Sequence, residues 1–209
     1  LDGTTFDHRL YQFALAYSGW RHVEVILGGE SWVALSTGLQ NALWALGGVP
    51  AEHRTDSLSA AFNNLAEREE LTRRYDELCG RYGMRATRNN LGVSHENGSI
   101  EARQGTIKRS IEQALLLRGS RDFTDLAGYR LFVAEVAMRL NARATKALTV
   151  ERACLQPLPS RRSSDYEEVD ARVTKFALIA VKCIPYSVPS RLVGQRLKIR
   201  VYDDRIEGY

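Results

Sequence analysis

The chain has 209 residues, of which 44% are hydrophobic and 26% are charged, with a formal net charge of +4. Its mean hydropathy is −0.30, which is typical of a globular protein and excludes a disordered or collagen-like chain. No run approaches the ~18 apolar residues that a membrane span needs, and the first residues lack both the pattern of a signal peptide and an initial Met, so the sequence predicts a fragment.

The cysteines and histidines do not form a metal-ligand pattern. No CxxC or HxxxH spacing occurs among Cys79, Cys154, Cys183, His8, His22, His53 and His95. The sequence therefore predicts neither a His/Cys metal site nor a disulfide framework. Scattered reduced thiols are typical of a cytoplasmic protein.

Charge is distributed unevenly along the chain. Residues 1–138 hold 15 basic and 17 acidic side chains, whereas residues 139–209 hold 14 basic and 8 acidic ones. A slightly acidic front and a basic rear suggest a catalytic body followed by a polyanion-binding tail. An ordinary solvated surface rich in arginine accounts for the charge equally well.

The first half of the chain alternates between strand and helix patterns. Two short apolar runs, His8–Ala16 and Arg21–Leu27, predict an antiparallel hairpin. An amphipathic helix follows, with Ser31 as its N-cap and Gly47 as its stop signal. A short strand ending at Asp56 comes next. The pattern then predicts a helix over 65–82 with an apolar stripe of Leu71, Tyr75, Leu78 and Tyr82. A strand over 84–87 and helices over 99–117 and 123–144 follow.

The rear of the chain reads as a linker and a small all-β part. Pro157, Pro159 and a serine- and arginine-rich run indicate a linker over residues 151–164. The short β runs beyond it, over 169–173, 178–184, 186–188 and 197–202, predict a small barrel or sandwich. We therefore expect an α/β fold with a mixed sheet flanked by helices in residues 1–150, and a barrel-like β module in residues 165–209.

Two carboxylates stand apart from the solvated helix surfaces. Asp56 ends a strand, where α/β sheets bind ligands, although the local sequence alone favours the alternative that Asp56 or Ser57 caps a short helix. Glu101 falls in the first turn of the predicted helix over 99–117, at the edge of its buried face, where the helix dipole alone also favours a carboxylate. Lys108 lies two turns later on the same side and could instead pair with Glu112.

Several segments together resemble the IstA-type insertion-sequence transposases, and the resemblance runs essentially from end to end. These enzymes belong to the DDE superfamily of transposases and retroviral-type integrases, which has an RNase H-like fold. The segments that carry the resemblance are HRLYQFALAYSGWRHVEVILGGES, GLQNALWALGGVP, HRTDSLSAAF, RYGMRATRNN, HENGSIEARQGTIKRSI and YSVPSRLVGQRLKIRVYDDRIE.

The resemblance implies a catalytic site. Asp56 would be the second and Glu101 the third member of an acidic triad, and the first Asp would lie on a strand upstream of Leu1. Such enzymes hold two Mg²⁺ or Mn²⁺ ions between the carboxylates and transfer DNA strands without a covalent intermediate. The resemblance also implies an N-terminal helix-turn-helix part, multimers on DNA ends and an AAA+ ATPase helper protein.

Basic residues complete the set of candidate site residues. The resemblance places Lys108 near the DNA end. The alternation of Lys198 and Arg200 with Ile199 and Val201 predicts a basic stripe on the solvent face of a strand. The residues expected to bind DNA are Lys108, Arg161, Arg162, Arg191, Arg196, Lys198 and Arg200.

Three functions are weighed from these observations. The first is a metal-dependent DNA strand transferase. The second is a DNA-binding or assembly remnant without activity, because the first catalytic Asp is missing from the sequence. The third, an RNase H-like nuclease, is disfavoured by the basic β-rich tail and by the resemblance. An edge strand that uses its charges only to avoid aggregation remains the alternative interpretation of the basic stripe.

Overall fold

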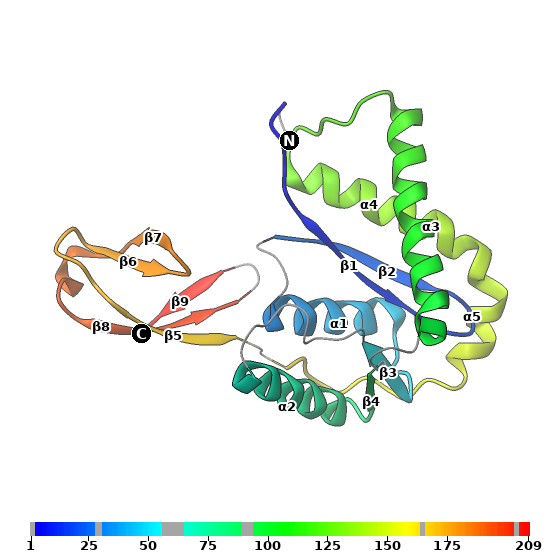
Figure 1. Ribbon diagram of the computed structural model, residues 1–209, viewed down its shortest axis with the longest axis horizontal. Coiled ribbons are helices and arrows are strands. Elements are labelled where there is room, and N and C mark those ends of the chain that lie inside the picture. Colours follow the sequence, from blue (N-terminus) through cyan, green and yellow to red (C-terminus); the bar gives the residue numbers. More distant parts are fainter. Residues whose placement is uncertain (1–2, 28–30, 56–64, 89–93, 164–165, 203–204) are drawn as a thin grey trace. The chain divides into compact units, whose positions relative to one another are not determined.

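The computed structural model describes residues 3–27, 31–55, 65–88, 94–163, 166–202 and 205–209. The chain divides into two compact units, Leu1–Ser163 and Ser164–Tyr209, and Figure 1 labels the elements of both. Among the described helices, none is both long and apolar enough to cross a membrane.

The first unit begins with the predicted hairpin. Strands β1 (Arg9–Ala14) and β2 (Arg21–Ile26) pair antiparallel, with Gln12 opposite Val23. Because side chains alternate across a strand, the hairpin has two apolar faces. Phe13 belongs to one buried cluster, whereas Val23 and Val25 belong to another.

Helix α1 (Trp32–Leu46) packs against the hairpin and has the predicted ends. The Ser31 side chain accepts a hydrogen bond from the Ala34 amide, and Gly47 ends the helix in the left-handed conformation. Gly38 faces the Tyr11 ring so closely that an added Cβ would lie 2.7 Å from it. Glycine at this position therefore permits the close approach of α1 to β1.

A βαβ unit follows. Strand β3 (Glu52–Thr55), helix α2 (Leu65–Arg81) and strand β4 (Arg85–Arg88) succeed one another, and β3 and β4 pair in parallel. The predicted apolar stripe of α2 is buried, with Tyr75 fully enclosed. This stripe joins α1 and Phe13 in the first cluster, so α2 covers the same core as α1.

Helices α3 (Ser94–Arg118) and α4 (Leu126–Asn141) enclose the second cluster together with Val23 and Val25 of β2. Helix α3 begins five residues before the predicted start at Ser99. The sequence expectation was wrong because one internal glycine, Gly98, costs only about 1 kcal/mol, which a helix of this length absorbs.

The chain after α4 was also predicted incompletely. A short 3-10 turn, η2 (Ala142–Ala144), leads into helix α5 (Thr145–Arg152), which the sequence did not indicate. Residues that were expected to form a linker bond to the first unit instead. Val49 and Gln156 form an isolated β-bridge, and the Ser163 amide donates to the Gln40 side chain at 2.7 Å.

The expected single mixed sheet is not formed by the described strands. They make two separate pairs, β1-β2 and β3-β4. The rings of Phe13 on β1 and His53 on β3 stack at 5.8 Å between centroids, so the two pairs meet through side chains. The first unit is thus α/β, with helices packed on both faces of the hairpin.

The second unit is all-β but is not a closed barrel. Its described strands are β5 (Glu167–Arg172), β6 (Leu178–Val181), β7 (Ile184–Ser187), β8 (Arg196–Val201) and β9 (Ile206–Gly208), with the 3-10 turn η3 (Ser190–Leu192) before β8. They form a three-stranded sheet in the order β5-β8-β9 and a hairpin of β6 and β7. Apolar side chains from β5, β6 and β8 fill the core.

Candidate functional site

The parallel pair β3-β4 positions the first candidate carboxylate. Parallel strands place their carboxyl ends at one edge, where α/β proteins bind ligands. Strand β3 ends at Thr55 and β4 ends at Arg88. Asp56 follows Thr55 directly in the sequence, but it lies outside the described residues.

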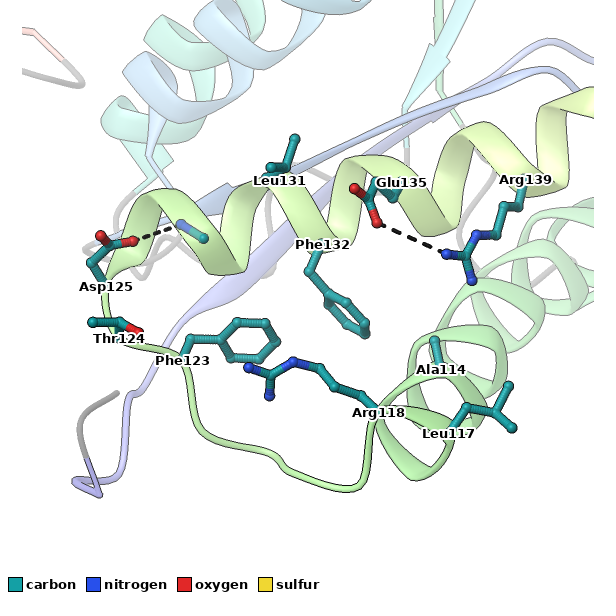
Figure 2. A pocket seen from close by; sticks show the side chains of 11 residues that line it. Ala114, Leu117, Arg118, Phe123, Thr124, Asp125, Leu131, Phe132, Glu135 and Arg139 are labelled. Atoms are coloured by element: carbon teal, nitrogen blue, oxygen red, sulfur yellow. Dashed lines mark hydrogen bonds and ion pairs between the residues drawn. The ribbon is translucent and has the colours of Figure 1, made fainter.

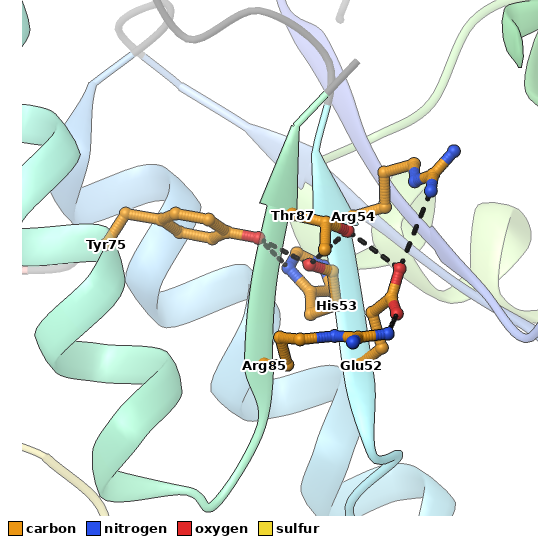
Figure 3. A network of polar contacts seen from close by, with 6 residues as sticks. All are labelled: Glu52, His53, Arg54, Tyr75, Arg85 and Thr87. Atoms are coloured by element: carbon orange, nitrogen blue, oxygen red, sulfur yellow. Dashed lines mark hydrogen bonds and ion pairs between the residues drawn. The ribbon is translucent and has the colours of Figure 1, made fainter. Parts of the chain in front are cut away.

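A network of polar contacts fixes the two strands to each other, as Figure 3 shows. The Glu52 carboxylate accepts hydrogen bonds from the Arg85 guanidinium and, at 2.9 Å, from the Thr87 hydroxyl. The Arg54 guanidinium lies 3.6 Å from the same carboxylate. The hydrogen bond from Arg85, followed by that from Thr87, holds the pKa of Glu52 below its ordinary value. Glu52 is therefore a structural carboxylate that is already satisfied.

On the other face of β3, His53 is buried against Tyr75. The Tyr75 hydroxyl donates to the carbonyl oxygen of His53 at 3.0 Å, and Nδ1 of His53 lies 2.7 Å from the same hydroxyl oxygen. Nδ1 is thus the donor in this contact. Burial lowers the pKa of His53 to about 4, so the imidazole is neutral at pH 7.

The second candidate carboxylate lies on α3. Because the helix starts at Ser94, Glu101 lies about two turns inside it and not in the first turn as expected. The helix dipole acts mainly within the first turn, so it no longer explains a carboxylate here. The side chain of Glu101 lies outside what the structure describes.

Farther along α3, Lys108 is exposed. The alternative partner considered for it, Glu112, instead forms an ion pair with Arg121 at 2.6 Å. Among the described contacts there is no Lys108–Glu112 pair. Lys108 thus presents its charge to solvent on the helix that carries Glu101.

A groove of about 630 Å³ opens between the end of α3 and α4, and Figure 2 shows its lining. Its charged groups are engaged within the protein. The Arg118 guanidinium lies 4.1 Å from the Phe123 ring and donates to the carbonyl oxygens of Ser120 and Asp122. The Asp125 carboxylate caps α4. No arrangement for acid–base chemistry lines this groove among the described residues.

Metal ligands were expected only at Asp56 and Glu101, and both of these side chains lie outside the described residues. Within the described residues, no three His, Cys, Asp or Glu side chains are grouped to hold a metal ion. Cys79 is buried, and Cys154 and Cys183 are exposed free thiols.

The arginines of the predicted linker differ in their surroundings. Arg161 is exposed. Arg162 donates to the Asn41 side chain at 2.5 Å, and its guanidinium lies 4.8 Å from the Trp44 ring. Arg162 therefore ties the chain to helix α1, a role that the sequence did not indicate.

The basic stripe on β8 alternates as predicted but faces acidic partners. Leu197 and Ile199 are buried and Lys198 is exposed. Lys198 forms an ion pair with Glu168 of β5 at 2.9 Å, which raises the pKa of Lys198 and lowers that of Glu168. The Arg200 guanidinium lies 3.9 Å from the same carboxylate. The periodicity of one strand could not reveal that its neighbour carries the compensating charge.

Tyrosines surround Arg200 as well. Its guanidinium lies 4.4 Å from the Tyr166 ring and 4.5 Å from the Tyr209 ring. Arg205 lies 3.9 Å from the Tyr202 ring and forms an ion pair with Glu207. This aromatic cluster was missed because its members come from three separate segments of the sequence. Arg191 and Arg196, in contrast, are exposed.

Comparisons with known proteins identify a relative of the second unit. Residues 158–209 match the family model described as Mu transposase, C-terminal domain. The chain is also similar to an uncharacterised protein of Sinorhizobium fredii, y4jA/y4nE/y4sE, with 53% identity over 209 residues that cover 99% of this chain and 42% of that protein. The chain thus spans about two fifths of the length of that relative. The second unit is accordingly similar to a transposase domain.

Proposed function

We propose that the chain is part of an IstA-like DDE transposase, with residues 1–163 contributing an RNase H-like catalytic unit and residues 164–209 binding DNA. The observation that carries this proposal is the match of residues 158–209 to a transposase domain. The α/β architecture of the first unit supports it, and so does the segment 171–202 of the second unit, which contains seven basic residues and no acidic one.

Asp56 and Glu101 are the proposed catalytic and metal-binding residues. Carboxylate oxygens are the donors that Mg²⁺ and Mn²⁺ prefer, so the donor type fits these ions. A bound metal pair supplies activation of the attacking hydroxyl and stabilisation of the leaving 3′-oxygen. Glu52 is not part of this set because Arg85 and Thr87 already satisfy its carboxylate.

The proposed partners follow from the resemblance. The complete protein would supply the first carboxylate from a strand upstream of Leu1, act as a multimer on transposon ends, and use an AAA+ helper to select target DNA. Lys108 would lie beside the DNA end, and it is exposed on the helix that carries Glu101.

DNA cleavage and strand transfer by the full-length protein test this proposal. The substrate is a labelled duplex that carries the end of the element encoding the protein, with Mn²⁺ or Mg²⁺ added. We expect Asp56→Asn and Glu101→Gln each to lower cleavage at least about a hundredfold, because direct metal ligands matter more than outer-shell groups. Glu77→Gln is the matched control, since this α2 carboxylate is exposed and, among the described contacts, pairs with Arg73 of its own helix.

A second candidate function is a DNA-binding or assembly protein without catalytic activity. The match to a transposase domain covers residues 158–209, of which all but 158–163 belong to the second unit, so it bears on DNA binding more directly than on catalysis. Full-length protein that binds the transposon end but does not cleave it with either metal would favour the alternative. Cleavage that survives in both acidic variants would refute the assignment of Asp56 and Glu101.

A further inference from the structure

Charge is segregated within the second unit. Residues 171–202 contain seven basic residues and no acidic one, whereas the acidic residues lie just before and just after this segment. The basic residues are Arg172, Lys175, Lys182, Arg191, Arg196, Lys198 and Arg200, and the acidic ones are Asp165, Glu167, Glu168, Asp170, Asp203, Asp204 and Glu207.

The pairing of β5 with β8 places opposite charges across from each other at one end of the two strands and like charges at the other end. In the antiparallel register Glu168 lies opposite Arg200 and Asp170 lies opposite Lys198, but Arg172 lies opposite Arg196. The two basic side chains of the stripe predicted on β8, Lys198 and Arg200, therefore each lie opposite an acidic residue of β5. At the end where β5 stops and β8 starts, two arginines face each other across the strands, and both are exposed.

Two further basic residues belong to this same end. The turn after β5 is bonded to the segment before β8: the Val173 amide donates to the Gln195 carbonyl oxygen at 2.9 Å, and the Gly194 amide donates to the Val173 carbonyl oxygen at 3.1 Å. Lys175 lies in the turn and Arg191 lies in η3, both exposed. In Figure 1 the turn and η3 lie together beside the start of β8.

The turn also carries an exposed aromatic ring. Phe176 is 73% exposed, and the Lys175 ammonium lies 5.1 Å from its ring. We name Arg172, Lys175, Phe176, Arg191 and Arg196 the basic end. Among the described residues, none of its four cations forms an ion pair with a carboxylate.

We propose that the basic end, and not the compensated stripe on β8, is the surface by which the second unit holds the phosphate backbone of duplex DNA. This inference rests on the proposed function and assigns the DNA contact to particular residues, of which Arg172, Lys175 and Phe176 were not indicated by the sequence. Like charges placed directly opposite each other across two strands destabilise a sheet. A phosphate close to Arg172 and Arg196 relieves that repulsion.

The arrangement of the four cations fits the sugar-phosphate backbone of DNA better than a single anion. Four cations come from three segments of the chain and are not gathered around one buried pocket, so they match a row of phosphates. Contacts of this kind give affinity without reading the base sequence. Phe176 supplies an apolar surface for contact with the sugars.

The test compares single-charge variants of the whole chain by fluorescence anisotropy with a short labelled duplex of arbitrary sequence. Arg196→Gln and Lys198→Gln remove one charge each, two residues apart on the same face of β8. We expect Arg196→Gln to lower the slope of log K against log salt by about one, and the double variant Arg172→Gln/Arg196→Gln to lower it by about two, with binding weakened on the order of tenfold. Lys198→Gln should change the slope by less than half as much.

Two controls keep the comparison interpretable. Arg205→Gln removes a charge that is paired with Glu207 and should leave the slope unchanged, and Arg196→Lys should retain binding because it keeps the charge. Far-ultraviolet circular dichroism checks that each variant is folded.

The outcomes separate this inference from the proposed function. If the unchanged chain binds the duplex but Lys198→Gln weakens binding as much as Arg196→Gln, the assignment to the basic end is wrong while the DNA-binding function stands. If the unchanged chain shows no salt-dependent binding at all, both the assignment and the DNA-binding role of this unit are overturned.

Discussion

Burial makes His53 a pH-sensitive element of the first unit. Its pKa falls from 6.5 to about 4 because burial disfavours the charged imidazole. The pKa of His53 is lower in the folded state than in the unfolded state. The stability that the neutral imidazole contributes is therefore fully present above pH 6.5 and is lost as pH falls toward 4. Each unit of pKa corresponds to about 1.4 kcal/mol, so about 3 kcal/mol of unfolding free energy should disappear over this range.

Urea unfolding of the first unit between pH 7 and pH 4 checks this prediction. We expect His53→Gln to be less stable than the unchanged chain at pH 7, because it loses the fitted contact with Tyr75, but to show a much weaker dependence on pH. His22→Gln is the control, since the His22 side chain is 20% exposed and pairs with Glu24 on the hairpin. An unchanged pH dependence in His53→Gln would show that other groups are responsible.

At the scale of elements, the β6-β7 hairpin carries local strain that can be removed. Val181 pairs with Ile184, so Lys182 and Cys183 form a two-residue turn, with φ of 49° and 65°. Turns of this type favour Asn-Gly, because a Cβ is disfavoured at positive φ and, among residues with a Cβ, Asn tolerates this conformation best. We expect Lys182→Asn/Cys183→Gly to stabilise the second unit by about 1–2 kcal/mol.

Differential scanning calorimetry measures this gain. Cys183→Ser is the matched control, because it removes the exposed thiol but keeps a Cβ at the same positive φ, so it should give no stabilisation. A gain of equal size in Cys183→Ser would attribute the effect to the thiol and not to the backbone.

Elements that depend on local patterns were predictable from the sequence. The α1 helix has its expected cap at Ser31 and its stop at Gly47, and all four residues of the predicted α2 stripe, Leu71, Tyr75, Leu78 and Tyr82, are buried. Caps, glycine stops and apolar spacing act within a few residues, so the sequence carries them directly.

Features that depend on distant segments were not predictable. The pairing of Lys198 with Glu168 spans 30 residues, and the contact of Arg162 with Asn41 spans 121. Neither follows from the periodicity of one strand or the composition of one linker. Helix α3 begins before the predicted start at Ser99, because Gly98 inside a helix costs only about 1 kcal/mol. The proposed partnership of Asp56 and Glu101 stays a prediction, since Asp56 and the Glu101 side chain lie outside the described residues.

At the scale of the whole molecule, the two units have separate cores. In the first unit the larger cluster centres on fully buried residues such as Leu39 and Tyr75. The described part of the second unit has six buried apolar residues, among them Ile199 at 1% exposure. A unit of this small size buries a limited fraction of its surface, so it should be the less stable of the two. We therefore expect two unfolding transitions on heating, with the second unit melting first.

The positions of the tryptophans make this prediction easy to resolve. Trp20, Trp32 and Trp44 all belong to the first unit, and the sequence has no other tryptophan. Tryptophan fluorescence therefore follows the first unit alone, whereas calorimetry records both transitions. Leu39→Ala should lower the free energy of unfolding of the first unit, followed by tryptophan fluorescence, by the ~2–5 kcal/mol typical of a buried leucine. The earlier calorimetric transition, which belongs to the second unit, should stay in place. Ile199→Ala should destabilise the second unit, which shifts the earlier calorimetric transition to lower temperature, and should leave the fluorescence transition in place. If each substitution moves both transitions together, the units fold as one cooperative body, and the separation of cores does not extend to their stability.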